Sequence, residues 1–200
     1  MPQIATDGQT PIAVRSALRS IAAARDDSGL VFTHQGSARV WPLVADHPLD
    51  FHFNPSTMGG VIPMALGMAL AQPDRQVIAL VGDGSLLMNL GSLVTATAAE
   101  CRNLKVILLD NRRYEVTGGQ HTVASRLEIR YDDLARSIGF RTADAYSDAD
   151  TWQARAGDFL AQDGPSFCWL KVAPALPDDM QTVQEPMAQQ LERIQKQLQS

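Results

Sequence analysis

Asp83 and Asn111 are the two side chains in this sequence best suited to a metal ion that also binds phosphate. Asp83 stands in the segment GDGS (residues 82–85), and Asn111 ends the pair DN (residues 110–111). Carboxylate and amide oxygens are hard ligands of the kind that Mg²⁺ takes when it bridges phosphate oxygens. The backbone carbonyl two residues after Asn111, that of Arg113, is a candidate third ligand. The two segments together therefore suggest a magnesium and diphosphate site.

The residues around Asp83 suit a backbone that approaches phosphate oxygens closely. Gly82 and Gly84 have no Cβ, so the chain can turn sharply there. Ser85 then opens a predicted helix, where free N–H groups and the positive end of the helix dipole favour a diphosphate. Alone, this motif is weak, because strand-to-helix turns often use Gly and Asp for conformational reasons. The alternative is a Rossmann-like turn that binds no ligand.

The elements between and around these segments predict parallel strands. Residues 76–81 (QVIALV) and 105–109 (KVILL) are continuous apolar runs, typical of parallel strands that are covered on both faces. Residues 85–100 suit one helix between them, and strand–helix–strand predicts a right-handed βαβ unit. Both segments would then lie at the carboxyl ends of strands, where open α/β sheets bind ligands. The apolar face of the helix would comprise Leu86, Leu90, Leu93 and Val94.

The rest of the chain continues this pattern. Further helices are predicted at residues 12–24, 58–71, 132–138 and 149–161, and further strands at residues 30–33 and 166–172. We expect one domain over residues 1–200, with an open α/β fold, a mainly parallel sheet and helices on both faces. Residues 175–200 are a polar tail with an amphipathic helix at 187–198. That helix either completes the domain surface or, as we prefer, contacts another subunit.

Composition favours a soluble globular protein. Apolar residues make up 45% and charged residues 20%, and a net charge of −5 argues against nucleic-acid binding. Cys101 and Cys168 form no CxxC pair, so zinc-ribbon, iron–sulfur and disulfide frameworks are not indicated. The longest uncharged run, residues 53–73, contains prolines and glycines and favours a buried helix over a membrane span. Residues 1–11 lack a secretory signal, so we expect a cytoplasmic protein.

The order GDGS, helix, strand, DN closely resembles the signature of thiamine-diphosphate-dependent enzymes. In that family the Asp of GDG, the final Asn and a carbonyl two residues later hold magnesium. The resemblance gives these roles to Asp83, Asn111 and Arg113, and it implies thiamine diphosphate and Mg²⁺ as cofactors. Asp110 departs from the usual Asn, at a position that is not a metal ligand. The resemblance runs from about residue 29 to 171 and covers the diphosphate-binding, C-terminal type of domain.

A second segment, residues 56–59 (STMG), resembles the family segment that cradles the aminopyrimidine ring of the cofactor. The resemblance implies that Met58 forces the cofactor into its bent form and that the carbonyl of Ser56 accepts from its amino group. The alternative is that Met58 is a core methionine. Gly36 and Ser37, after the first predicted strand, could contribute a hydroxyl to the diphosphate.

A third segment, residues 111–122 (NRRYEVTGGQHT), resembles sulfopyruvate and phosphonopyruvate decarboxylases, which carry Glu four residues after the Asn, then GGQ and Thr. It adds Tyr114 and Glu115 to the expected cofactor-binding residues, with Glu115 as a catalytic candidate that handles protons. A carboxylate in the first turn of a helix would be favoured there without any catalytic role. Thr117 stands where simple pyruvate decarboxylases carry an acid. Candidate anchors for a second anionic group on the substrate are Arg112, Arg113, His121 and Arg126.

The resemblance also implies that half of the cofactor site lies on another polypeptide. The glutamate that activates the cofactor belongs to a separate pyrimidine-binding domain, for which a chain of 200 residues leaves no room. We therefore expect a pyrimidine-binding α subunit and an α2β2 or higher hetero-oligomer. The predicted function is the β subunit of a split decarboxylase that converts a small 2-oxo acid, of sulfopyruvate or phosphonopyruvate type, to carbon dioxide and an aldehyde. The alternatives are a carboligase subunit similar to acetolactate synthase, or a non-catalytic scaffold that binds the cofactor. No nucleic-acid or membrane partner is expected.

Overall fold

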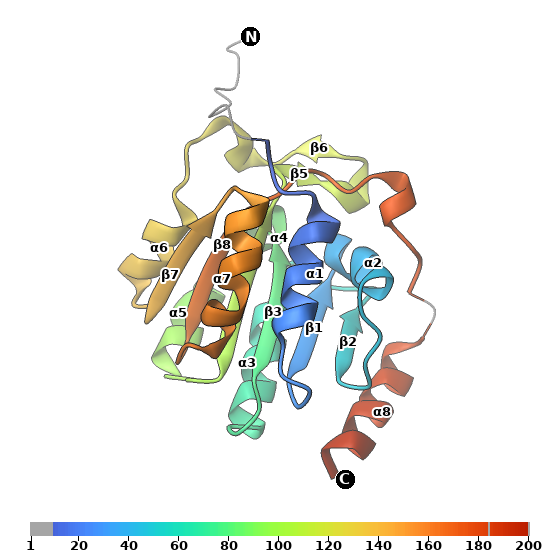
Figure 1. Cartoon of the computed structure of the whole chain (residues 1–200). Helices are drawn as coiled ribbons and strands as arrows, with labels where there is room; N and C mark the ends of the chain where they lie inside the picture. Colours follow the sequence, from blue (N-terminus) through green and yellow to red (C-terminus); the bar gives the residue numbers. More distant parts are fainter. Residues whose placement is uncertain (1–9, 184, 200) are drawn as a thin grey trace.

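A computed structural model describes residues 10–183 and 185–199, which form a six-stranded sheet between two layers of helices (Figure 1). The strand order is β2-β1-β3-β4-β8-β7, and every neighbouring pair is parallel. The strands are β1 (Leu30–His34), β2 (Asp50–Phe53), β3 (Val77–Gly82), β4 (Leu104–Asp110), β7 (Thr142–Tyr146) and β8 (Ser166–Lys171). The predicted fold class is confirmed.

The strands are buried on both faces because their alternate residues belong to two hydrophobic cores. In β3, Val77, Ala79 and Val81 face one core, and Ile78 and Leu80 face the other. This explains the continuous apolar runs in the sequence. The first core lies under α3 (Val61–Ala71), α5 (Gly91–Ala98), α6 (Tyr131–Ile138) and α8 (Met187–Gln199). The second lies under α1 (Val14–Ala24), α2 (Gly36–Val40) and α7 (Ala149–Ala161).

The single helix predicted over residues 85–100 is wrong, because the segment forms two helices. A short α4 (Asp83–Met88) precedes α5, and Asn89 leaves the helical conformation with φ −146° and ψ 54°. Its side-chain Nδ2 donates to the carbonyl of Gly59 at 3.0 Å, a contact that a continuous helix would not place there. Val94, assigned to the buried face, is 55% exposed.

Two edge strands, β2 and β7, were not predicted from the sequence. β2 (DFHF) alternates polar with apolar residues, and β7 (TADAY) has no long apolar run, because each strand has only one neighbour in the sheet. The remaining elements are short. They are a hairpin of β5 (Arg113–Tyr114) with β6 (Gln120–His121), and the 3₁₀ turns η1 (Trp41–Leu43), η2 (Glu115–Thr117), η3 (Val123–Arg126) and η4 (Pro177–Asp179).

The C-terminal helix α8 packs on the edge strand β2. The amide of Gln190 accepts from the backbone N–H of His52 at 2.6 Å and donates to its carbonyl at 3.4 Å. Ile194 is 2% exposed in the first core, whereas Leu191 is 49% exposed. The helix therefore covers an otherwise open strand edge. The structure favours the interpretation that α8 completes this domain, which was not the one we preferred.

The predicted buried helix in the long uncharged run is α3, which begins at Val61 rather than at residue 58 and contributes Val61, Ile62 and Ala65 to the first core. Within residues 10–183 and 185–199, no helix combines the length and apolar character needed to cross a membrane.

Candidate active site

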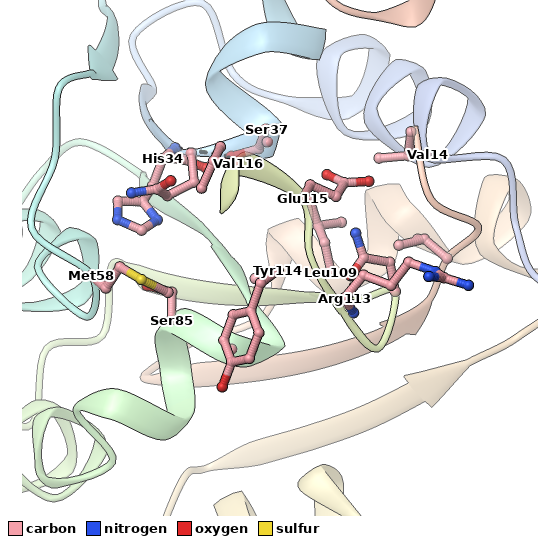
Figure 2. A pocket seen from close by; sticks show the side chains of 16 residues that line it. Val14, His34, Ser37, Met58, Ser85, Leu109, Arg113, Tyr114, Glu115 and Val116 are labelled. Atoms are coloured by element: carbon pink, nitrogen blue, oxygen red, sulfur yellow. Dashed lines mark hydrogen bonds between the residues drawn. The ribbon is translucent and has the colours of Figure 1, made fainter. Parts of the chain in front are cut away.

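A pocket lies at the carboxyl ends of the neighbouring strands β1, β3 and β4 (Figure 2). The last residues of these three strands are His34, Gly82 and Asp110. Ten of the twelve predicted cofactor-binding residues line it, and only Ser56 and Asp83 do not. Those ten are Gly36, Ser37, Met58, Gly82, Gly84, Ser85, Asn111, Arg113, Tyr114 and Glu115. The parallel topology thus brings four segments that are far apart in the sequence to one place.

Asp83 stands between Gly82 and Gly84, which line the pocket, and is itself 1% exposed. Its Oδ2 accepts a hydrogen bond from Oγ1 of Thr122 at 2.8 Å. Burial, and then the nearby negative charge of Asp110, raise the pKa of Asp83 to about 7. A divalent cation beside Asp83 would offset both effects and favour the ionised carboxylate.

Asp110 and Asn111, the second motif, extend the same polar cluster. Asp110 is 6% exposed, and its Oδ2 accepts from Nε1 of Trp169 at 3.0 Å. Burial raises the pKa of Asp110 as well. Asn111 is half-buried, and its Oδ1 accepts from the backbone N–H of Arg113 at 2.8 Å. Asp110 is therefore held by the fold, whereas Asn111 stands at the pocket wall.

The predicted metal ligands at this site fit a magnesium ion better than a transition metal. No cluster of three or more His, Cys, Asp or Glu side chains suited to a metal occurs in the described part of the chain. The predicted set instead combines one carboxylate, one amide and one backbone carbonyl, all oxygen ligands, which suits Mg²⁺ with part of its shell left to water or phosphate.

The glycines of the site serve different purposes. A Cβ on Gly82 would meet nothing within 4 Å, so this position faces open space in the pocket, as a close approach to phosphate requires. A Cβ on Gly84 would overlap the ring of Tyr114, and one on Gly36 would overlap the carboxylate of Glu115. Those two glycines are thus dictated by neighbouring side chains, a reason not foreseen from the sequence.

Glu115 begins η2 and is already hydrogen-bonded within the chain. Its Oε1 accepts from the backbone N–H of Ala175 at 2.7 Å, which ties the loop after β4 to the segment after β8. Figure 2 shows Glu115 and Arg113 on one side of the pocket, with Met58 and His34 on the other. The carboxylate lines the pocket and has one structural partner, and its predicted role with protons stays a prediction.

Met58 lines the pocket and lies outside both hydrophobic cores, so the core-methionine alternative is not supported. The residue after it, Gly59, is fixed from α4. Its N–H donates to Oγ of Ser85 at 2.8 Å, and its carbonyl accepts from Asn89. Ser85 therefore accepts one bond and retains its own hydroxyl proton for a ligand.

Ser37 is placed differently from our expectation of a hydroxyl available to a diphosphate. Its Oγ donates to the carbonyl of His34 and accepts from the N–H of the same residue, both at 2.9 Å. The side chain is buried and its proton is used within the chain.

Three polar residues of the site were missed from the sequence. Thr122 is bonded to Asp83, and the Thr that follows GGQ in the resembling decarboxylases was a signal that could have identified it. His34 and Gln35 line the pocket beside Met58, and no motif marked them.

Comparison with known proteins assigns this fold and site to a class. Residues 34–169 match the family described as thiamine pyrophosphate enzyme, C-terminal TPP binding domain. Because the match covers more than half of the chain, the protein belongs to this family of thiamine-diphosphate-binding domains. The resemblance inferred from the two motifs is thereby confirmed.

Individual proteins similar to this chain give more detail than the family model. The chain is 42% identical over 135 residues to the sulfopyruvate decarboxylase subunit beta of Methanothermobacter thermautotrophicus, covering 68% of each chain. It is 32% identical over 170 residues to a phosphonopyruvate decarboxylase of Streptomyces viridochromogenes, covering 85% of this chain and 42% of that one. Its fold is similar to the thiamine-diphosphate-dependent 4-hydroxybenzoylformate decarboxylase of Rhodococcus jostii, with a TM-score of 0.68 and 19% identity, covering 86% of this chain and 34% of that one. This chain spans less than half the length of the second and third of these proteins.

Proposed function

We propose that this chain is the β subunit of a split thiamine-diphosphate-dependent decarboxylase. Its substrate would be a small 2-oxo acid of sulfopyruvate or phosphonopyruvate type, and its products carbon dioxide and an aldehyde. The observation that carries this proposal is that ten predicted residues converge on one pocket, in which Gly82 and Gly84 flank the buried Asp83. The likeness to a protein named as a decarboxylase β subunit supports the substrate class.

The pocket residues have distinct roles in this proposal. The side chains of Asp83 and Asn111 and the carbonyl of Arg113 hold Mg²⁺, and Ser85 donates its free hydroxyl proton to the diphosphate. Met58 supports the aminopyrimidine and thiazolium rings of the cofactor. When bound, thiamine diphosphate supplies a carbon nucleophile for the keto group and an electron sink as carbon dioxide leaves. Glu115, on the opposite side from Met58, exchanges protons with the reacting group.

The pocket of this chain alone is too small for the whole cofactor. Its volume is about 60 Å³, against roughly 300–1,000 Å³ for sites that enclose small molecules. A pyrimidine-binding α subunit that supplies the activating glutamate would complete it. Beside the site, Val123 and Leu127 are 74% and 60% exposed, which supports a covering partner at this end of the sheet. The expected assembly is α2β2 or a larger multiple.

The experiment is reconstitution. The chain is purified alone and with the pyrimidine-binding subunit with which it copurifies, and each sample is given Mg²⁺, thiamine diphosphate and a panel of sulfopyruvate, phosphonopyruvate and pyruvate. We expect carbon dioxide and aldehyde from the mixture alone, with sulfopyruvate or phosphonopyruvate, which carry a second anionic group, preferred over pyruvate. A coupled product in place of the aldehyde would indicate a carboligase, and a bound cofactor without turnover would indicate a scaffold. Full turnover by the isolated chain would contradict the split site.

A further inference from the structure

We infer that His34 and Gln35 are positioning residues that hold the segment 56–58, and with it Met58, against the pocket. This inference rests on the proposed function and adds two residues to it. Both residues line the pocket; His34 is the last residue of β1, and Gln35 follows it directly. They reach a segment that is some twenty residues further along the chain.

Two side-chain hydrogen bonds make this connection. Nε2 of Gln35 donates to Oγ of Ser56 at 2.8 Å, and Nε2 of His34 lies 3.2 Å from the carbonyl oxygen of Thr57. Because a carbonyl can only accept, Nε2 of His34 carries the proton. The His34 ring also packs beside Phe53, with ring centroids 5.9 Å apart. One end of the segment is thus held from β1.

The other end is held from α4. Ser85 and Asn89 bond the N–H and the carbonyl of Gly59. The residue between the two sets of bonds is Met58, whose own side chain is left to face the pocket. Figure 2 shows His34, Met58 and Ser85 on the same side of the pocket. The segment is therefore gripped on both sides of the one residue expected to shape the cofactor.

Gln35 holds its position at a conformational cost. Its backbone has φ 54° and ψ −118°, a region that residues with a Cβ rarely adopt. Among the described residues other than glycine, positive φ angles occur at Gln35, Glu100 and Arg112. Glycine would adopt this conformation without strain, so the presence of Gln at the pocket favours a role for its amide.

His34 also breaks an ordinary rule of packing. It is 1% exposed, and its Nδ1 is buried with no hydrogen-bond partner among the described residues. An apolar side chain would fill the site without that cost. The bond from Nε2 to Thr57 is the one interaction of this ring with the segment that an apolar residue could not make.

The expected consequence concerns the rings of the cofactor rather than its phosphates. A reacting group misplaced by about 1 Å can lower the rate on the order of 100-fold. Loosening the segment should therefore lower turnover and the contribution of the rings to binding. It should leave the binding of the diphosphate and Mg²⁺ at Asp83 unchanged.

Gln35→Gly tests this, because it should stabilise the fold and loosen the segment at once. Its matched control is Glu100→Gly, which relieves a similar φ of 52° at an exposed position after α5, near the opposite end of the sheet. Both variants should unfold at higher temperature than the wild-type chain. Only Gln35→Gly should speed hydrogen exchange at the amides of Gly59 and Gly60. The expected increase is about fivefold, because one hydrogen bond is lost.

Calorimetry on the same full-length chains, each reconstituted with the pyrimidine-binding subunit, gives the functional readout. Mg²⁺ with inorganic pyrophosphate reports the diphosphate site, and Mg²⁺ with thiamine diphosphate adds the rings. Gln35→Gly should bind pyrophosphate with the same affinity as the wild type. The ratio of its affinities for thiamine diphosphate and pyrophosphate should fall about fivefold. In the reconstituted enzyme its kcat should fall more than its KM rises. Glu100→Gly should change none of these.

His34→Phe provides the second variant, since it keeps a ring beside Phe53 and removes the donor to Thr57. It should speed exchange at Gly59 and lower the preference for thiamine diphosphate over pyrophosphate. Should Gln35→Gly fail to fold, Gln35→Ala removes the amide while keeping the native strain, and it should give the same local changes. Unaltered exchange, preference and kcat in the Gln35 and His34 variants would overturn the inference. A reconstituted wild-type enzyme that binds no Mg²⁺ pyrophosphate would instead contradict the proposed function.

Discussion

The two ends of the parallel sheet use buried polar groups in opposite ways. At the amino end, Nδ2 of Asn103 donates to the carbonyls of Ala69, Gln72 and Arg75 at 2.8–3.1 Å, which joins the end of α3 to the start of β4. Lys105 donates to the carbonyl of Gln162 in the same region. These polar groups are satisfied by backbone of the same chain.

At the carboxyl end, burial raises the pKa values of Asp83 and Asp110, and Nδ1 of His34 has no partner among the described residues. A fold gains nothing by placing two carboxylates in one buried cluster, so this end is arranged for something the chain does not itself supply. The comparison indicates that Asn103 at the amino end serves stability, whereas the polar cluster at the carboxyl end serves binding. Substitutions at the two ends should therefore separate these properties.

Asp83→Ala should have the largest effect on binding and little effect on folding. Removing one oxygen ligand leaves the diphosphate charge poorly neutralised, and we expect a loss of affinity for Mg²⁺ and thiamine diphosphate of about 100-fold or more. The apo protein should be at least as stable as the wild type, because a costly buried carboxylate is gone. Titration calorimetry and thermal unfolding measure the two. Asn111→Ala should weaken binding in the same way, and unchanged affinity in both variants would contradict the metal assignment.

Met58→Ala should separate turnover from affinity at the same end of the sheet. The diphosphate contacts remain, so cofactor affinity should change by only a few fold. The rings would no longer be held in a reactive geometry, so kcat of the reconstituted enzyme should fall about 100-fold. Steady-state kinetics at saturating cofactor measure this. Equal losses of affinity and turnover would point to a packing role instead.

Asn103→Ala should reverse this pattern at the amino end. It removes an amide whose two N–H groups are shared among three part-buried backbone carbonyls, and we expect the free energy of unfolding to fall by about 2–3 kcal/mol. Affinity for Mg²⁺ and thiamine diphosphate should stay within twofold of the wild type. Urea denaturation and calorimetry provide the measurements. A large loss of affinity would show that the two ends are coupled.

The same division explains what the sequence could predict. GDGS and DN are local signals at strand ends, and together with the family resemblance they led to ten of the sixteen residues that line the pocket. The missed strand β2 depends on distant residues. Its Asp50 is buried by bonds to Trp41 (2.8 Å) and Arg25, although an aspartate in the sequence indicates a surface position.

The break in the predicted helix and the roles of His34 and Gln35 have the same origin. Asn89 ends α4 while bonded to Gly59, and Gln35 reaches Ser56 from a backbone conformation that its residue type does not suggest. Each of these features arises from a contact between segments, which periodicity and local motifs do not encode. Thr122 differs from them, because the family pattern around GGQ already contained it.

The smallest expected effect is a pH dependence of stability that comes from Lys105. Burial lowers the pKa of this lysine to about 8, although Asp163 nearby partly opposes the shift. In the unfolded chain its pKa should be about 10.4. Between these two values the unfolded state binds a proton that the folded state has released, so the free energy of unfolding should rise as the pH rises from about 8 to about 10.

Lys105→Met isolates this contribution, because it keeps the length of the side chain and removes the charge. The variant should be more stable than the wild type at pH 7, where the folded wild-type protein holds a buried ammonium group. Its advantage should shrink toward pH 10, because the wild-type lysine is then neutral in the folded state. Urea denaturation of both proteins at pH 7, 8.5 and 10 measures the difference, and cofactor affinity at pH 7 should be equal in the two. A difference that stays constant with pH would show that the charge of Lys105 is not what limits stability at this end of the sheet.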